Sequence, residues 1–478
     1  MAVVARTDDR FLFRVLVASG VLRMIATIAT HPYVYVDSID YETLDFSGGG
    51  RRPWVTPLLY DLASDPKLRT LLQAMIGAMA WIVLAVEVGQ QARHRWAQRG
   101  ATVAVLLLSL TTSITNWDNT ILSESLALST LAVFAACLLR FARLGGIRDA
   151  AFATIAALFW IFTRQNHLVL GLLITASVVV LAVVRWRRAG RTAATPVGAL
   201  AAGLVVVSAL AVTFYGQNTQ IVHFNTAMVI GNRLLLEPDS IAWMQGHGMP
   251  ALPEGITIGA PVNPEPLLAD PAFRDWIEDD GVGTYARFLL THPWTTFTQP
   301  LDDFVSDRKS FADPDYVDET MLSTAEAYSS ARNVMPEPIE DILFDPGQTG
   351  TLLLVLVLTI LLTADRWRRS GPDPRWTVPL LAIGLQWPAL TVVWHASAAE
   401  LGRLSLISAV GLRIGLVTQI ALLADAWLLE RVTATSVHVG GEGVADVAAE
   451  VDDGVDEPDG DGGGADDDGE PVAERRRR

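Results

Sequence analysis

The chain has 478 residues, of which 51% are hydrophobic, and its formal net charge is −16 at pH 7. Positive mean hydropathy and recurring apolar runs of about twenty residues exclude an ordinary soluble enzyme, because such a run can cross a hydrocarbon core of about 30 Å. No continuous basic face is visible, so we expect no nucleic-acid partner, and the single cysteine, Cys137, excludes a disulfide framework.

The first apolar run extends from Phe11 to Thr30 and has no small-residue cleavage site, so it predicts an uncleaved first span rather than a signal peptide. Nine further runs follow, at residues 71–89, 101–115, 121–139, 150–162, 168–184, 197–214, 350–364, 377–394 and 404–425. The sequence therefore predicts an all-α polytopic membrane protein with about ten transmembrane helices.

Arginines are concentrated in every second connection between these runs. They are Arg93, Arg95, Arg99, Arg140, Arg143, Arg148, Arg185, Arg187, Arg188, Arg191, Arg366, Arg368 and Arg369. The positive-inside rule places these connections and both termini in the cytoplasm of a multi-pass protein of the cell membrane. An even number of spans is required for this arrangement, and ten spans meet that requirement.

The stretch from residue 150 to residue 184 is too long for one span, since as a single helix it would measure about 50 Å. Arginines at both of its ends require two crossings, so the polar residues 163–167 are predicted to form an outer hairpin tip. The same reasoning places residues 116–119 and 395–403 on the outer side.

We divide the chain into four parts. Residues 1–214 form an N-terminal membrane module with seven spans and a first outer loop at 31–67. Residues 215–349 contain enough apolar and aromatic side chains to fold as a small extracytoplasmic subdomain. Residues 350–430 supply three more spans, and the acidic, glycine-rich residues 431–478 form a disordered cytoplasmic tail.

Polar residues gather at the predicted outer ends of the spans. They are Asp37, Asp40, Arg51, Arg52, Asp118, Glu124, Arg164, His167, Glu400 and Arg403. Carboxylates can accept a proton or hold a divalent metal, and arginine suits phosphate, so the set fits a lipid-phosphate substrate. No cofactor is assigned with certainty; Asp118 and Glu124 are the candidate ligands for a divalent metal.

Each of these residues also has a structural interpretation. A loop carboxylate such as Asp40 is often only solvated, Arg51 and Arg52 suit lipid headgroups, and His167 suits a structural hydrogen bond. Glu124 is a stronger candidate, because an acid at the start of an apolar run is rare and usually functional. Arg413 lies within the last run and requires a partner.

Four short motifs, in the same order and spacing, resemble the GT-C superfamily of membrane glycosyltransferases, which includes protein O-mannosyltransferases and aminoarabinose transferases. They are an acidic stretch with a tyrosine from Asp37 to Tyr41, a proline-rich stretch from Arg52 to Tyr60, Leu122 to Leu126 around Glu124, and an arginine-containing turn from Phe162 to Asn166. The resemblance covers about the first 170 residues. Residues 285–294 look like a piece of outer loop in uncharacterised relatives.

The resemblance implies a lipid-linked sugar donor in the outer leaflet, with its phosphate held by Arg164, by Arg403, or by Arg51 and Arg52. Asp37 or Asp40 would be the general base, which implies inversion at the anomeric carbon. Glu124 and Asp118 would orient an acceptor that the sequence does not identify.

Three other functions remain open on sequence grounds. A surface-polysaccharide polymerase or ligase also has many spans and a large outer loop. A transporter or lipid flippase places polar residues near the midplane of the membrane, where Glu87 and Arg413 are the main charged candidates. A non-catalytic scaffold could keep the same fold.

Overall fold

The computed structural model describes residues 10–28, 32–34, 36–47, 52–306, 334–344, 349–371, 374–398 and 401–447. The chain divides into two compact units, Met1–Leu428 and Leu429–Arg478. Helix α20 (Leu401–Val447) begins in the first unit and ends in the second, and every other element below belongs to the first.

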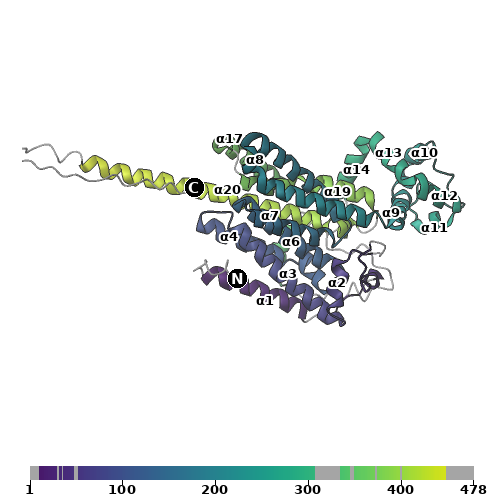
Figure 1. Ribbon diagram of the computed structural model, residues 1–478, viewed down its shortest axis with the longest axis horizontal. Coiled ribbons are helices and arrows are strands. Elements are labelled where there is room, and N and C mark those ends of the chain that lie inside the picture. Colours follow the sequence, from purple (N-terminus) through teal and green to yellow (C-terminus); the bar gives the residue numbers. More distant parts are fainter. Residues whose placement is uncertain are drawn as a thin grey trace, which may run out of the picture. The chain divides into compact units, whose positions relative to one another are not determined.

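The predicted N-terminal membrane module folds into long helices that lie side by side (Figure 1). They are α1 (Arg10–Ile28), α3 (Pro66–Gly89), α4 (Arg95–Ser109), α6 (Glu124–Leu144), α7 (Ile147–Ile161) and α8 (His167–Tyr215). Helix α3 packs against α1, α4 and α6, and α7 packs between α6 and α8. Side chains from these helices and from α20 form the main hydrophobic core.

Local sequence explains where these helices begin and end. Asp65 caps α3 by accepting hydrogen bonds from the backbone N–H groups of Lys67 and Leu68, and Pro66 suits the first helical position. Gly145 ends α6 with a φ of +66°, a conformation that glycine adopts without a steric penalty.

Helix α8 is two antiparallel helices joined at Gly190, whose φ of +79° and ψ of 177° are not helical. In a straight helix, Thr175 and Ser208 would lie about 50 Å apart. Their hydroxyl oxygens are instead 2.9 Å apart, so the chain folds back on itself. The predicted runs 168–184 and 197–214 correspond to these two halves.

Short elements connect the long helices at the end of the bundle opposite to the start of α1 (Figure 1). They are η2 (Val36–Tyr41), α2 (Val55–Asp61), α5 (Thr112–Thr115) and η3 (Asn116–Asn119). An isolated bridge pairs Tyr33 with Thr120 and joins the loop between α1 and α3 to the segment before α6.

Residues 219–306 form a second group of helices with a hydrophobic core of its own. Its elements are α9 (Thr219–Asn232), η4 (Leu234–Leu236), α10 (Pro238–Gln245), α11 (Pro264–Ala269), α12 (Pro271–Trp276), the π-helical turn η5 (Ile277–Gly281), α13 (Val282–Thr291) and α14 (Pro293–Ser306). The extracytoplasmic subdomain expected at residues 215–349 stays a prediction, since these helices belong to the same compact unit as the bundle.

The remaining described helices are α16 (Glu337–Phe344), α17 (Thr349–Ser370), α18 (Pro374–Gly384), α19 (Gln386–Ala396) and α20. Each of the ten predicted runs overlaps a helix. By length and composition, six helices of the described chain could each cross a membrane. The number is seven if α4 and the following segment Thr112–Asn119, which is bent by 59° relative to α4, together count as one span. This count treats α8 as one helix.

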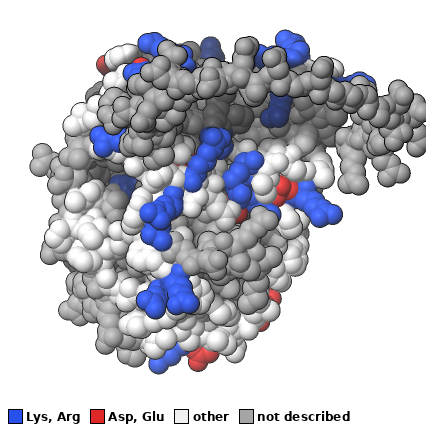
Figure 2. Space-filling model, turned by 90° about the vertical axis from the view of Figure 1, so that its left-hand side faces the viewer, with Lys and Arg blue, Asp and Glu red and all other residues white. Residues whose placement is uncertain are grey.

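Positive charge is distributed unevenly over the molecule. Figure 2 shows the end at which α1 begins, where Lys and Arg side chains gather and few acidic ones are visible. The arginine-rich connections from α3 to α4 and from α6 to α7 lie at this end, opposite to η2 and α2 (Figure 1).

Candidate functional site

Asp37, Asp40 and Arg52 form a partly exposed cluster in the loop between α1 and α3. The two carboxylates belong to η2, a 3₁₀-helix, in which residues three apart project from the same side. Nη2 of Arg52 lies 3.0 Å from an oxygen of Asp37 and 3.2 Å from an oxygen of Asp40. The exposed fractions of the side chains are 33% for Asp37, 15% for Asp40 and 23% for Arg52. The cluster is therefore accessible, and its net charge is reduced by the shared arginine.

Hydrogen bonds attach this cluster to the start of α6. The hydroxyl of Ser38 donates to the carbonyl of Ile121 at 2.7 Å, and the hydroxyls of Tyr41 and Ser123 are 2.9 Å apart. Both contacts join η2 to the chain segment that leads to Glu124. The first and third motifs of the resemblance are thus brought together.

Tyr60 supports the same junction from α2. Its hydroxyl lies 2.6 Å from the side-chain oxygen of Gln73 and 2.9 Å from the carbonyl of Leu122. Burial raises the pKa of Tyr60 well above its usual value, and the neighbouring Tyr41 and Glu124 raise it further. The Tyr60 phenol therefore stays neutral and available as a donor.

Glu124 and Arg164 form a buried ion pair. Nη1 of Arg164 lies 2.9 Å from Oε1 of Glu124, with side-chain exposures of 8% and 1%. Trp54 contacts Phe162, two residues before Arg164, with ring centroids 5.7 Å apart, so the loop between α1 and α3 also reaches this turn. All four motifs therefore meet at one end of the bundle. The geometry gives Arg164 a carboxylate partner, which favours a positioning role over the predicted phosphate contact.

His167 is also buried, and its contacts suit a structural role. Its Nδ1 lies 2.8 Å from the carbonyl of Trp160, and its ring stacks on that indole with centroids 5.1 Å apart. Among the described residues, Nε2 has no hydrogen-bond partner.

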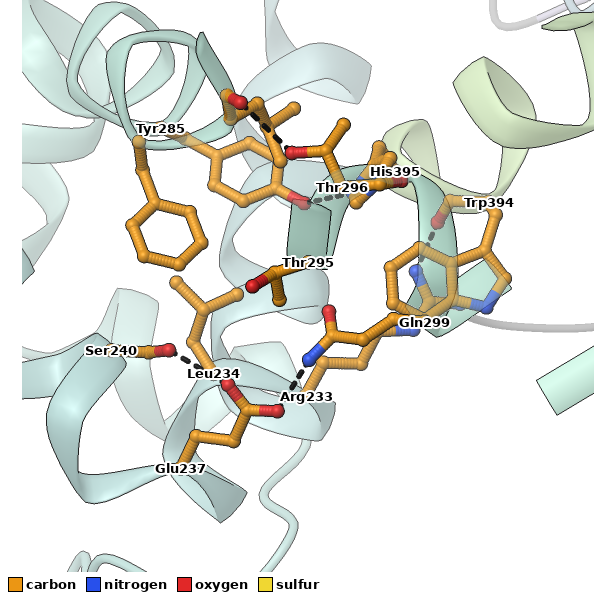
Figure 3. A pocket seen from close by; sticks show the side chains of 12 residues that line it. Arg233, Leu234, Glu237, Ser240, Tyr285, Thr295, Thr296, Gln299, Trp394 and His395 are labelled. Carbon is orange, nitrogen blue, oxygen red and sulfur yellow. Dashed lines mark hydrogen bonds between the residues drawn. The ribbon is translucent and has the colours of Figure 1, made fainter. Parts of the chain in front are cut away.

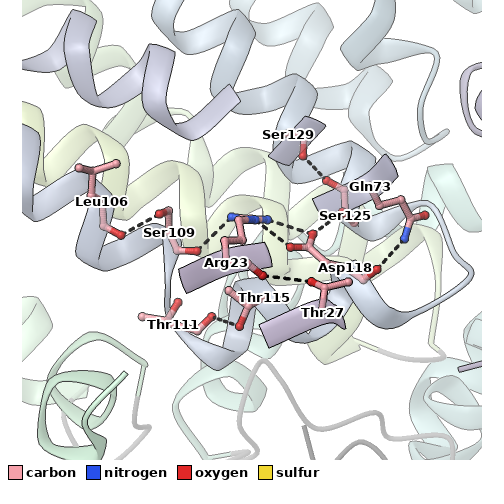
Figure 4. A network of polar contacts seen from close by, with 10 residues as sticks. All are labelled: Arg23, Thr27, Gln73, Leu106, Ser109, Thr111, Thr115, Asp118, Ser125 and Ser129. Atoms are coloured by element: carbon pink, nitrogen blue, oxygen red, sulfur yellow. Dashed lines mark hydrogen bonds and ion pairs between the residues drawn. The ribbon is translucent and has the colours of Figure 1, made fainter. Parts of the chain in front are cut away.

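Asp118 forms an ion pair with Arg23, a residue that was not among the predicted site residues (Figure 4). Arg23 donates from Nε and Nη2 to the two carboxylate oxygens at 2.8 and 3.0 Å, and from Nη1 to the carbonyl of Ser109. Ser125 donates a further bond to Asp118 at 2.6 Å. The position of Arg23 inside an apolar run indicated that it needs an acidic or polar partner, since a charge at membrane depth requires one. This geometry favours a structural role for Asp118 over a substrate contact.

The candidate metal ligands, Asp118 and Glu124, are thus both paired with arginine. The described part of the chain contains no group of three or more His, Cys, Asp or Glu residues placed to hold a metal ion. The geometry favours ion pairing over metal binding at both carboxylates.

Three predicted site residues have no described side chain. Arg51 and Glu400 lie outside the described residues, and Arg403 lies in α20 at a position where only the backbone is described. Arg413, which requires a partner, donates to the backbone carbonyls of Leu343 and Ala409.

A second polar cluster joins the helices of the second core to α19, and no motif predicted it (Figure 3). The guanidinium of Arg233 lies 3.7 Å from the ring centroid of Trp394 and donates to the carbonyls of Trp394 and Ser397. The Tyr285 hydroxyl is 2.9 Å from Nδ1 of His395. The enclosed space is about 10 Å³, which is about enough for one water molecule, so this cluster is a packed junction rather than a ligand pocket.

Comparison of the chain with protein-family models, with characterised proteins and with solved structures finds no match. The site described above has an accessible part and a buried part. Its accessible part can accept a proton at a carboxylate and contact an anion through Arg52. Its buried part fixes the elements that carry those groups.

Proposed function

We propose that this protein is an integral membrane glycosyltransferase of the GT-C type, which transfers a sugar from a polyprenyl-phosphate carrier to an extracytoplasmic acceptor. The observation that carries the proposal is the pair of partly exposed carboxylates, Asp37 and Asp40, which share Arg52 next to the start of α6. A general base and a cation at one membrane face are what a lipid-phosphate sugar donor requires.

The proposed topology has ten spans, with both termini in the cytoplasm. The spans are α1, α3, α4, α6, α7, the two halves of α8, α17, α18 with α19, and α20. The concentration of Lys and Arg at the end where α1 begins supports this orientation (Figure 2). Residues 215–349 would then form an extracytoplasmic subdomain, and residues 431–478 a cytoplasmic tail.

Exposed apolar side chains in the same loop as the cluster suit a lipid-linked donor. Ile39, between the two carboxylates in the chain, is 69% exposed, and Phe46 and Leu62 are 62% and 72% exposed. In water this exposure would be unfavourable, whereas the outer leaflet can cover it. A polyprenyl chain could reach Arg52 along the same surface.

The proposed chemistry is a direct displacement. Asp37 is the preferred base because its side chain is more exposed than that of Asp40. Its carboxylate accepts the proton of an acceptor hydroxyl, whose oxygen forms a bond to the anomeric carbon. The bond from that carbon to the phosphate oxygen breaks on the opposite face, and polyprenyl phosphate leaves with the electron pair. The configuration is therefore inverted. Arg52 is placed to balance the negative charge of the phosphate.

The test is sugar transfer by the purified protein in liposomes. Radiolabelled hexoses and pentoses are supplied as polyprenyl-phosphate esters, and a delipidated envelope extract supplies acceptors. We expect one donor to be consumed with release of polyprenyl phosphate. Failure of the wild-type protein to consume any donor in the panel would contradict the proposal.

A further inference from the structure

The two halves of α8 separate as they approach Gly190 and leave an open gap of about 250 Å³. The gap is lined by Ala182, Val183, Trp186, Arg191, Ala194, Thr195 and Gly198. Small residues explain why it is not filled: a Cβ added at Gly198 would meet no heavy atom within 4 Å. Farther from the turn the two halves touch, at Thr175 and Ser208.

Four exposed arginines lie in the segment that contains the turn: Arg185, Arg187, Arg188 and Arg191, of which Arg191 lines the gap. None of the four guanidinium groups makes a hydrogen bond, an ion pair or a ring contact with another described residue; the one side-chain bond here is the Thr195 hydroxyl donating to the backbone carbonyl of Arg191. Their own chain segment offers no acid, since residues 150–236 contain neither Asp nor Glu. At the neighbouring connection, by contrast, Arg140 and Arg143 are paired with Asp149 and Glu87. Within the described part of the chain, the positive charge at this turn therefore has no acidic partner.

Helix periodicity indicates which of these arginines project toward the gap and which project away from it. With 3.6 residues per turn, Arg188 projects from nearly the opposite side of the helix to Trp186, which lines the gap. Arg185 and Arg187 are both next to Trp186 in the chain and project to either side of it, whereas Arg191 lines the gap. Arg187 and Arg191 can thus approach one anion at the mouth of the gap, and Arg188 cannot.

We propose that this gap binds an anionic phospholipid, with part of an acyl chain between the two halves of α8 and the phosphate on Arg187 and Arg191. The apolar lining suits the chain, and guanidinium groups bind phosphate oxygens in pairs. Trp186, 51% exposed beside the gap, is the residue type that marks the boundary between lipid and water. Basic pockets between transmembrane helices bind anionic headgroups by the same chemistry. This site is independent of glycosyl transfer.

Native mass spectrometry of the full-length protein tests the proposal. The protein is equilibrated in detergent with equal amounts of phosphatidylglycerol and phosphatidylcholine of identical acyl chains. We expect the wild-type protein to retain at least threefold more phosphatidylglycerol, and the variant Arg187→Gln/Arg191→Gln to lose that preference. The matched control Arg188→Gln should keep it.

A second variant, Gly198→Leu, fills the gap without changing charge. We expect it to reduce the retained amount of both lipids, because the acyl chain loses its place. An unchanged lipid preference in Arg187→Gln/Arg191→Gln, or an equal loss in Arg188→Gln, would overturn the proposal. Retention of the wild-type amount of lipid by Gly198→Leu would also overturn the proposal. This variant provides the test if the double variant does not fold.

Discussion

Replacing Arg23 by Met tests whether the buried network in Figure 4 holds the membrane helices together. The change removes three hydrogen bonds and the cation that faces Asp118, whose side chain is 0% exposed. Of the side-chain donors to Asp118, the hydroxyl of Ser125 remains. Removing one partner of a buried ion pair typically costs about 3–5 kcal/mol, because the other charge stays buried without compensation. We expect a loss of that size in the free energy of unfolding.

Arg369→Met is the matched control. Arg369 pairs with Asp365 in α17, but both side chains are more than half exposed, at 69% and 53%. Exposed pairs contribute between about 0 and 1 kcal/mol, so this variant should change the unfolding free energy by less than about 1 kcal/mol. The same residue type is removed in both variants, and only the surroundings differ.

The assay is reversible unfolding in mixed detergent micelles, followed by tryptophan fluorescence. It includes Asp118→Asn and the double variant Arg23→Met/Asp118→Asn. Because Asn carries no charge, loss of Arg23 should cost less in the Asp118→Asn background than in the wild type. Equal losses for Arg23→Met and Arg369→Met would refute the reasoning.

Three further predictions concern the site and its junctions. Arg164→Ala should lower the yield of folded protein on gel filtration, because Glu124 is left buried without its ion pair; a normal yield with a raised KM for the donor would instead return Arg164 to the phosphate site. Because the pKa of Tyr60 is raised in the folded protein, its neutral phenol contributes stability that is fully present below about pH 10 and is lost as the pH rises further. The thermal midpoint above pH 10 should therefore fall more for the wild type than for Tyr60→Phe. Parallel falls in the two proteins would contradict this prediction. Arg233→Ala removes the stacking on Trp394, so limited proteolysis of residues 219–306 should become about tenfold faster, and an unchanged rate would show that other contacts hold this segment.

The helices were predictable because their evidence is local. Apolar runs of adequate length lie where the helices form, and the arginines at both ends of residues 150–184 required the outer turn at residues 163–167. A membrane leaves the backbone few alternatives to helix, so composition and length predict the elements well. The fold-back at Gly190 follows for the same reason, since arginines separate two runs that are each long enough to span.

The roles of the charged residues were harder to predict, because they depend on partners far away in the chain. Arg23 and Asp118 are separated by 95 positions, and Arg164 and Glu124 by 40. Arg23 was overlooked inside an apolar run, whereas Arg164 was noticed but assigned to a phosphate rather than to a carboxylate. Asp37 and Asp40 were recognised as a pair because their spacing is local, although their shared partner was not predicted to be Arg52.

The most direct test of the account is a comparison of sugar transfer by Asp37→Asn and Asp61→Asn in the liposome assay. Asp61 is an exposed acid in the same loop between α1 and α3 and lies outside the cluster, so it controls for loss of charge. A general base typically contributes 10²–10⁴-fold, so we expect the rate with Asp37→Asn to fall by about that factor while unfolding is unchanged. Asp61→Asn should retain the wild-type rate. Wild-type transfer by both Asp37→Asn and Asp40→Asn would contradict the proposed catalytic role of this cluster.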